Sequence, residues 1–160
     1  MNAEKSPKLS PGIILLLVYL VYSVIISFIG LFRPVVIAGP LLLTGYKAAF
    51  WKLIVLLVLT TGTYALYTRR HWSIYLIAGY MFYGLAVVWA ELITFLTAKD
   101  RLVHVYQEAQ ELINLPVNID SRSVFPALVI GAALKTVLYT GIVIYLFILR
   151  KRFGEKTWTG

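Results

Sequence analysis

Residues 12–32 read GIILLLVYLVYSVIISFIGLF and carry no charge over their whole length. At a helical rise of about 1.5 Å per residue this run is about 31 Å long, which matches the hydrocarbon thickness of a bilayer. Lys5 and Lys8 precede it, as basic residues precede the apolar part of a signal peptide. The run is longer than that apolar part, however, and no small-x-small cleavage site follows it. We therefore predict that residues 12–32 form an uncleaved first membrane span.

Three further apolar runs of similar length follow, at about residues 48–68, 73–98 and 125–149. Trp51 and Trp72 bracket the second run, at the positions where indole rings anchor at membrane interfaces. Backbone amides find no water inside a bilayer, so runs of this length are expected to be helices. The sequence thus predicts an all-α integral membrane protein built as a four-helix transmembrane bundle.

The composition indicates a membrane rather than an aqueous setting. Of the 160 residues, 60% are apolar or aromatic and 14% are charged, whereas soluble domains carry about 45–50% apolar and about 25% charged residues. A soluble core of this size cannot bury so much apolar surface. The chain also has no cysteine, which excludes a disulfide scaffold. We expect a single transmembrane domain over residues 1–160, and we exclude a disordered chain and an ordinary soluble enzyme.

Basic residues flank the spans and predict their orientation. An even number of spans places both termini on one side of the membrane. That side carries eight lysines and arginines and the opposite side carries six, a bias that favours cytoplasmic termini in the cell membrane. The net charge of +8 arises mainly at the span ends, where anionic headgroups account for it. We therefore expect membrane lipids, and not nucleic acid, as partners of these residues.

The connection over residues 34–46 is apolar but too short to span a bilayer. Pro34 is expected to end the first helix, and Gly39-Pro40 marks either a turn or the start of a new helix. The segment is then interfacial or an early start of the second helix. A re-entrant loop that lines a cavity, as in transporters, is the alternative.

Residues 100–114 lie in the longest polar connection and have the period of an amphipathic helix. Apolar residues recur there at steps of three and four: Leu102, Val105, Tyr106, Ala109, Leu112 and Ile113. Pro116 is expected to end this helix. Its polar face is acidic, unlike that of helices that bind anionic lipid, so we expect it to cap the bundle or to meet a protein partner. Residues 118–123 should form a polar turn into the fourth span, with Pro126 in the first helical turn.

Lys135 lies about ten residues into the fourth span and thus near the middle of the bilayer. A lysine at that depth costs about 2.5–3.5 kcal/mol or more, so it is expected to face protein or water. Its stem reaches outward toward Glu91, the one acidic residue within the four runs, and we predict an ion pair between spans three and four. This intramembrane polar pair either fixes helix packing or takes part in proton, ion or ligand binding. Lys52 is an interfacial anchor or a third member of the same site.

Small residues predict which spans touch. Ala132, Thr136 and Thr140 follow one another at four-residue steps on the fourth span, and the third span contains Gly79 and Gly84. Such residues let helix backbones approach closely inside a membrane. The pattern therefore favours close packing of the third and fourth spans.

Catalytic and cofactor motifs are absent from the sequence. His71 and His104 are separated by a whole span, so they cannot hold one haem or one metal ion within a single chain. The sequence has no phosphate-binding glycine loop, no nucleophile elbow and no His-Glu-x-x-His pair. We expect no enzyme activity, no cofactor and no metal site.

These features predict a non-catalytic accessory or assembly subunit that packs against other subunits of a larger membrane complex. Small size, sparse intramembrane charge and an acidic helix available to a partner favour this role. One alternative is a small transporter or channel that uses Lys135 and Glu91, which requires a homo-oligomer because four spans rarely enclose a pathway alone. A membrane protein that binds a lipid or a quinone is another.

Overall fold

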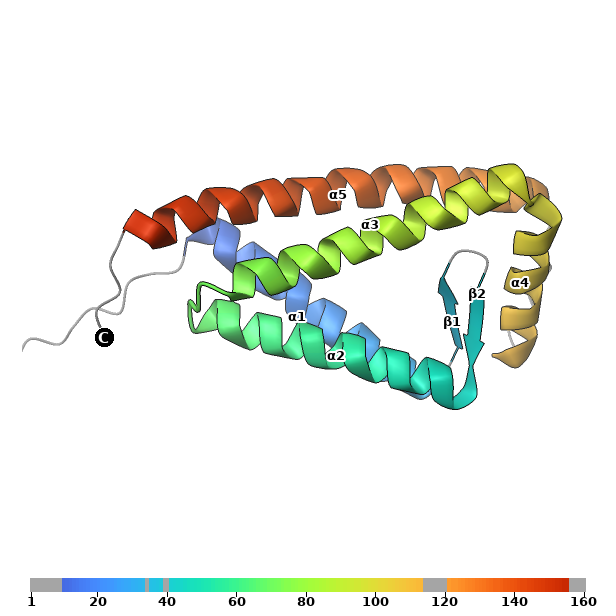
Figure 1. Cartoon of the computed structure of the whole chain (residues 1–160), viewed down its shortest axis with the longest axis horizontal. Coiled ribbons are helices and arrows are strands. Elements are labelled where there is room, and N and C mark those ends of the chain that lie inside the picture. The colour runs from blue at the N-terminus through green and yellow to red at the C-terminus, as the bar shows by residue number, and fades with distance from the viewer. Residues whose placement is uncertain (1–9, 34, 39–40, 114–120, 156–160) are drawn as a thin grey trace, which may run out of the picture.

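The computed structural model describes residues 10–33, 35–38, 41–113 and 121–155. Within these residues the chain forms five helices and one β-hairpin (Figure 1). In chain order they are α1 (Pro11–Leu31), β1 (Val35–Ala38), β2 (Leu41–Thr44), α2 (Gly45–Tyr67), α3 (Ser73–Thr97), α4 (Lys99–Leu112) and α5 (Ser121–Glu155).

Four of the described helices are long and apolar enough to cross a membrane. They are α1, α2, α3 and the part of α5 from Phe125 to Arg150. Few side chains in these helices are buried in the isolated chain, as expected where hydrocarbon covers the surface. The predicted all-α integral membrane bundle, with a shorter helix between the third and fourth spans, is confirmed.

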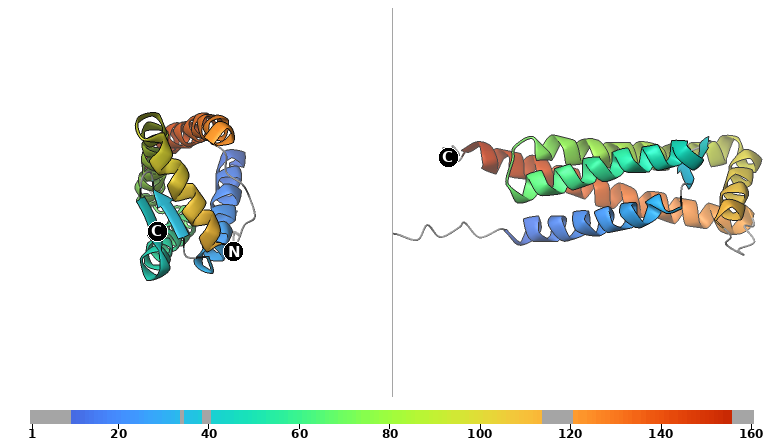
Figure 2. Two further views of the ribbon diagram at one scale, coloured as in Figure 1. Left: turned by 90° about the vertical axis from the view of Figure 1, so that its right-hand side faces the viewer. Right: turned by 90° about the horizontal axis from the view of Figure 1, so that it is seen from below.

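The described start of α1, the turn between α2 and α3, and the end of α5 lie at one end of the bundle, whereas the hairpin and α4 lie at the other (Figure 1). Toward this second end, the pair α1 and α2 diverges from the pair α3 and α5. The hairpin contacts α2, α3 and α4 there. Helix α4 crosses the same end diagonally (Figure 2).

The hydrophobic core lies in the half of the bundle near the α2–α3 turn. All four long helices contribute to it: Leu16, Leu20, Leu59, Leu66, Ile74, Ile77, Ala78, Met81, Val143 and Leu146. The close packing predicted for the third and fourth spans is confirmed, because α3 and α5 are in contact. Phe95 stacks on Phe125 at one end of the pair, and Arg150 lies over the ring of Tyr75 at the other. Gly84 of α3 lies directly against the ring of Tyr139 on α5, so the missing side chain is what lets the two helices approach.

Residues 35–38 and 41–44 form an antiparallel strand pair, which was not predicted from the sequence. Its register pairs Val35 with Thr44 and Ala38 with Leu41. The early helix start at Pro40 is wrong, since α2 begins at Gly45, whose φ of +57° suits glycine. Val35, Val36 and Ile37 are β-branched and favour a strand. The two strands then satisfy each other's backbone hydrogen bonds without a helix. Pro34 and Gly39-Pro40 lie outside the described residues.

Helix α5 begins earlier than predicted, at Ser121, so Pro126 lies inside the helix rather than in its first turn. Because proline has no backbone N–H, the helix lacks the hydrogen bond that another residue at position 126 would donate to the carbonyl of Arg122. The expected polar turn over residues 118–123 is wrong for its last three residues, which are helical, and residues 114–120 lie outside the described part. The polar residues before Phe125 show where the apolar span begins, but they do not show where the helix begins, because a helix can extend beyond the apolar run into the interface.

Helix α4 confirms the predicted amphipathic helix between the third and fourth spans. It buries Leu102, Val105 and Ala109, which are part of the expected apolar stripe. Exposed charged residues such as Glu111 lie on the opposite face. The buried face packs on α3 and the hairpin, so α4 covers this end of the bundle.

Candidate functional site

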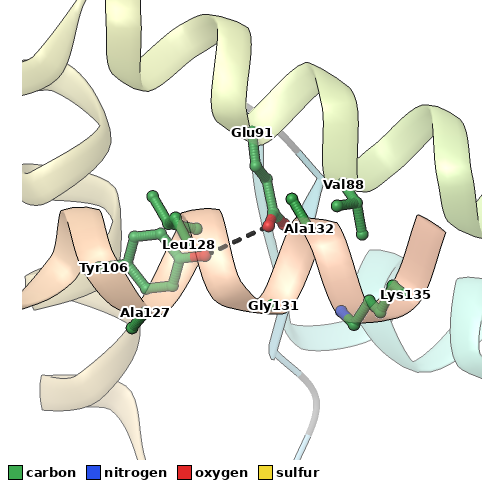
Figure 3. A pocket seen from close by; sticks show the side chains of 8 residues that line it. All are labelled: Val88, Glu91, Tyr106, Ala127, Leu128, Gly131, Ala132 and Lys135. Atoms are coloured by element: carbon green, nitrogen blue, oxygen red, sulfur yellow. Dashed lines mark hydrogen bonds between the residues drawn. The ribbon is translucent and has the colours of Figure 1, made fainter. Parts of the chain in front are cut away.

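A cavity of about 290 Å³ lies where α3, α4 and α5 meet, in the half of the bundle away from the main core (Figure 3). Small residues on α5 create the room for it. Ala127, Gly131 and Ala132 line the cavity, and a side chain added at Gly131 would meet nothing within 4 Å. Ala127, Gly131 and Lys135 follow each other at four-residue steps and so form one stripe along the helix.

Glu91 reaches this cavity from α3 and is half-buried. The Tyr106 hydroxyl of α4 donates a hydrogen bond to Glu91 Oε2 over 3.4 Å, so the carboxylate has one protein partner (Figure 3). Desolvation by burial, together with the neighbouring Glu91 carboxylate, raises the pKa of the Tyr106 phenol above its ordinary value. Tyr106 therefore stays protonated and remains a donor at neutral pH.

Tyr106 was not singled out as a site residue in the sequence. In the sequence, Tyr106 is part of the apolar stripe of the amphipathic helix, where a tyrosine is counted as one more hydrophobic residue. Its polar tip becomes informative only once α4 is known to fold back over α3.

Lys135 lines the same cavity from α5 and is exposed in the isolated chain. It lies ten residues after Phe125, which corresponds to a depth of about 15 Å along the span. The ammonium group and the Glu91 carboxylate do not come within the 4.0 Å of an ion pair. The structure thus brings the two predicted partners to one cavity without joining them inside a single chain.

Lys52 lies elsewhere, at the end of α1. Its ammonium group donates a hydrogen bond of 2.7 Å to the carbonyl of Gly30 and a second one to the carbonyl of Arg33. The last carbonyls of a helix have no partner within the helix and carry the negative end of its dipole. In the structure Lys52 therefore caps α1 from α2, and it is not among the residues that line the Glu91 cavity.

A second, mainly apolar groove of about 270 Å³ lies between α2 and α3. Trp51 of α2 donates a hydrogen bond of 3.0 Å from Nε1 to the hydroxyl of Tyr83 on α3, and the two rings are 5.5 Å apart. Gly79 leaves open space beside them. Aromatic side chains with a satisfied polar tip are typical of the membrane interface.

One carboxylate, one phenol and one ammonium group can bind charged or hydrogen-bonding groups, either of a ligand or of a neighbouring transmembrane chain. Among the described residues, no group of three or more histidine, aspartate or glutamate side chains could hold a metal ion. The Glu91 cavity is thus a mainly apolar cavity with three polar side chains, Glu91, Tyr106 and Lys135, and it is the candidate binding site of this chain.

Comparison with known proteins adds nothing to this description of the site. No protein-family model, no curated protein and no solved structure matches the sequence or the fold significantly.

Proposed function

We propose that this protein is a non-catalytic assembly subunit of a larger membrane complex, and that it binds another transmembrane chain at the Glu91–Lys135 cavity. The observation that supports this role is Lys135, a charged residue in the middle of a candidate span that is exposed in the isolated chain and has no carboxylate of the described residues within 4.0 Å. The bias of basic residues further supports a cell-membrane location with cytoplasmic termini.

An exposed lysine at this depth is unfavourable in hydrocarbon. Insertion of a lysine at the centre of a span costs about 2.5–3.5 kcal/mol. The side chain can move its charge part of the way toward the interface, but a span of 26 residues leaves it far from either end. A polar or acidic group from a neighbouring chain removes this cost, and the small residues beside Lys135 allow that chain to approach.

Purification of the tagged protein in a mild detergent, followed by mass determination of the intact particle, tests this role. We expect wild-type protein to leave the membrane with a stoichiometric partner, and Lys135→Met to lose it. Lys47→Met is the matched control, because Lys47 is exposed at the start of α2 and lies outside the cavity. A wild-type particle with the mass of one chain and no bound protein contradicts the proposal.

A second candidate function is an oligomeric transporter or channel. It is favoured by the cavity itself, where an acidic and a basic side chain lie without an ion pair between them. Reconstitution into liposomes tests this candidate: flux of an ion or a small solute that disappears in Glu91→Gln and Lys135→Met supports transport. Liposomes that stay as tight as protein-free ones contradict it. A lipid or quinone recovered in fixed ratio with the purified chain would instead support a binding role.

A further inference from the structure

We infer that the chain which docks at the Glu91–Lys135 cavity is a second copy of this protein. In the resulting two-fold dimer the Lys135 of each copy pairs with the Glu91 of the other. This inference rests on the proposed assembly role and names the partner at that site, so that the dimer is the unit that enters a larger assembly.

The first argument is charge complementarity. Glu91 is the one acidic residue in the four candidate spans, and Lys135 is the one basic residue in the interior of the fourth. Both lie on one cavity, yet they do not pair within the chain. An identical chain therefore offers a carboxylate to Lys135 and an ammonium group to Glu91 at the same cavity.

The second argument is symmetry. A two-fold interface uses the same surface on both subunits, so if residue i of one copy contacts residue j of the other, j also contacts i. A face that carries one acid and one base satisfies this condition twice, with two equivalent ion pairs. Each pair is shielded from water, where charge-assisted contacts can fix the orientation of the partner.

The third argument is depth in the membrane. A two-fold axis along the membrane normal keeps every residue at the depth it has in one chain. Glu91 lies six residues before Thr97, about 9 Å from the end of α3, and Lys135 lies about 15 Å from the corresponding end of the fourth span. The four-carbon stem of lysine covers the difference, because it can extend toward the interface.

The fourth argument is access. Ala127 is exposed on the same stripe of α5 as Lys135, and nothing approaches within 4 Å of a side chain added at Gly131. Helix α5 is also the least buried of the four candidate spans. A second copy can therefore bring its own helices close to this stripe, and packing of small residues contributes stability in a lipid environment.

Complementary charge reversals test the reciprocal pairs. We would make the wild type, Glu91→Lys and Lys135→Glu each with either of two affinity tags. The two tags are then co-expressed on the same variant or on the two different variants, and pairs are isolated from detergent-solubilised membranes through both tags in sequence. Two copies of the same variant place like charges opposite each other at both contacts, so recovery of same-variant pairs should fall about tenfold or more relative to wild type. The mixed pair restores opposite charges at both contacts and should return to the wild-type recovery.

This design separates contacts between chains from contacts within one chain. If Glu91 and Lys135 paired inside one chain, mixing the two variants would rescue nothing, because each chain would keep two like charges. That outcome overturns the inference. So does a Lys135-dependent complex that contains a different protein and a single copy of this chain, a result that would leave the proposed assembly role intact. A wild-type chain that has neither a second copy nor another protein bound to it in native membranes overturns both the dimer and the assembly role.

A cysteine cross-link tests the same interface with both charges unchanged. The chain has no cysteine of its own, and the open space at Gly131 accepts a new side chain. We expect Gly131→Cys to form a disulfide-linked dimer in native membranes under mild oxidation. Gly141→Cys is the matched control, since Gly141 lies on the same helix, also has open space, and does not line the cavity. Equal cross-linking of both variants, or of neither, contradicts the inference.

Discussion

The phenol of Tyr106 forms a hydrogen bond between α4 and α3 at the cavity. Tyr106 of α4 donates to Glu91 of α3, and hydrogen bonds to a charged acceptor contribute about 1.5–3 kcal/mol when they are well formed. The separation of 3.4 Å is long, which places this bond at the weak end of its class. It nevertheless gives the half-buried carboxylate a donor within hydrogen-bond distance.

We expect Tyr106→Phe to lower the stability of the folded protein by about 1 kcal/mol, because the Glu91 carboxylate then loses its donor in a partly buried site. The midpoint of thermal unfolding in detergent measures this. Tyr46→Phe is the control, since Tyr46 is 80% exposed and the same hydroxyl is removed there without a buried partner. Equal effects of the two changes would show that the bond to Glu91 contributes nothing.

Gly84 determines how closely α3 and α5 approach. A methyl group added there would lie 2.6 Å from Cε2 of Tyr139, closer than two carbon atoms can be. We expect Gly84→Ala to destabilise the bundle by about 1–3 kcal/mol, because the ring or the helix must move. Thermal unfolding in detergent checks this value.

Gly79→Ala is the matched control for that experiment. Gly79 lies on the same helix, and a methyl group there meets nothing within 4 Å. It should cause no loss of stability, since alanine is the better helix former. A Gly84→Ala protein as stable as this control would contradict the close approach of the two helices.

At the scale of elements, helix α1 ends against a lysine of its neighbour. The Lys52 ammonium group bonds the carbonyls of Gly30 and Arg33, and so it joins the end of α1 to α2 on the side where the hairpin begins. A lysine this close to an interface does not require a function in transport, because the carbonyls at a helix end are sufficient partners for its ammonium group.

We expect Lys52→Met to weaken this junction by about 0.3–1 kcal/mol, the range for a cation near a helix C-terminus, or up to about 2 kcal/mol when partly buried. Limited proteolysis of the purified protein, followed over time, would show faster cleavage near residues 30–45. Lys47→Met provides the control, as an exposed lysine of the same helix. Unchanged cleavage in Lys52→Met would mean that the two carbonyls find equivalent partners without the lysine.

At the scale of the whole molecule, four spans place the α2–α3 turn and helix α4 at opposite ends of the bundle (Figure 1). In a membrane, these two regions then lie on opposite sides. The absence of cysteine makes this arrangement easy to probe, since every added cysteine is the only one in the chain.

We expect Glu108→Cys to react with a membrane-impermeant maleimide in intact cells, and Arg70→Cys to react only after the membrane is opened. Both residues are exposed, at the α4 end and the α2–α3 turn respectively. This outcome follows from the proposed orientation, in which both termini lie in the cytoplasm. The reverse pattern would contradict the orientation alone, whereas labelling of both positions from the same side would contradict four spans.

The number, length and approximate ends of the four spans could be read from the sequence, because the solvation cost of charge and of backbone groups in hydrocarbon acts on each run separately. Helix α4 could be predicted for the same reason, because its three- and four-residue apolar period lies within one short segment. The hairpin was not predicted, since its backbone groups pair with each other and with no helix, and apolar residues flanked by proline and glycine fit several conformations. The true start of α5 was missed because its first residues are polar but still helical.

For the candidate site, the sequence by itself determined that Glu91 and Lys135 are intramembrane charges, because any charge within an apolar run is visible as such. Only the tertiary structure decided that both reach one cavity, that they do not join within the chain, that Tyr106 arrives from α4 to bind Glu91, and that Lys52 caps α1 instead. The reason is physical: burial in a bilayer depends on the composition of one segment, whereas a contact between side chains depends on the rotation, tilt and spacing of several helices at once.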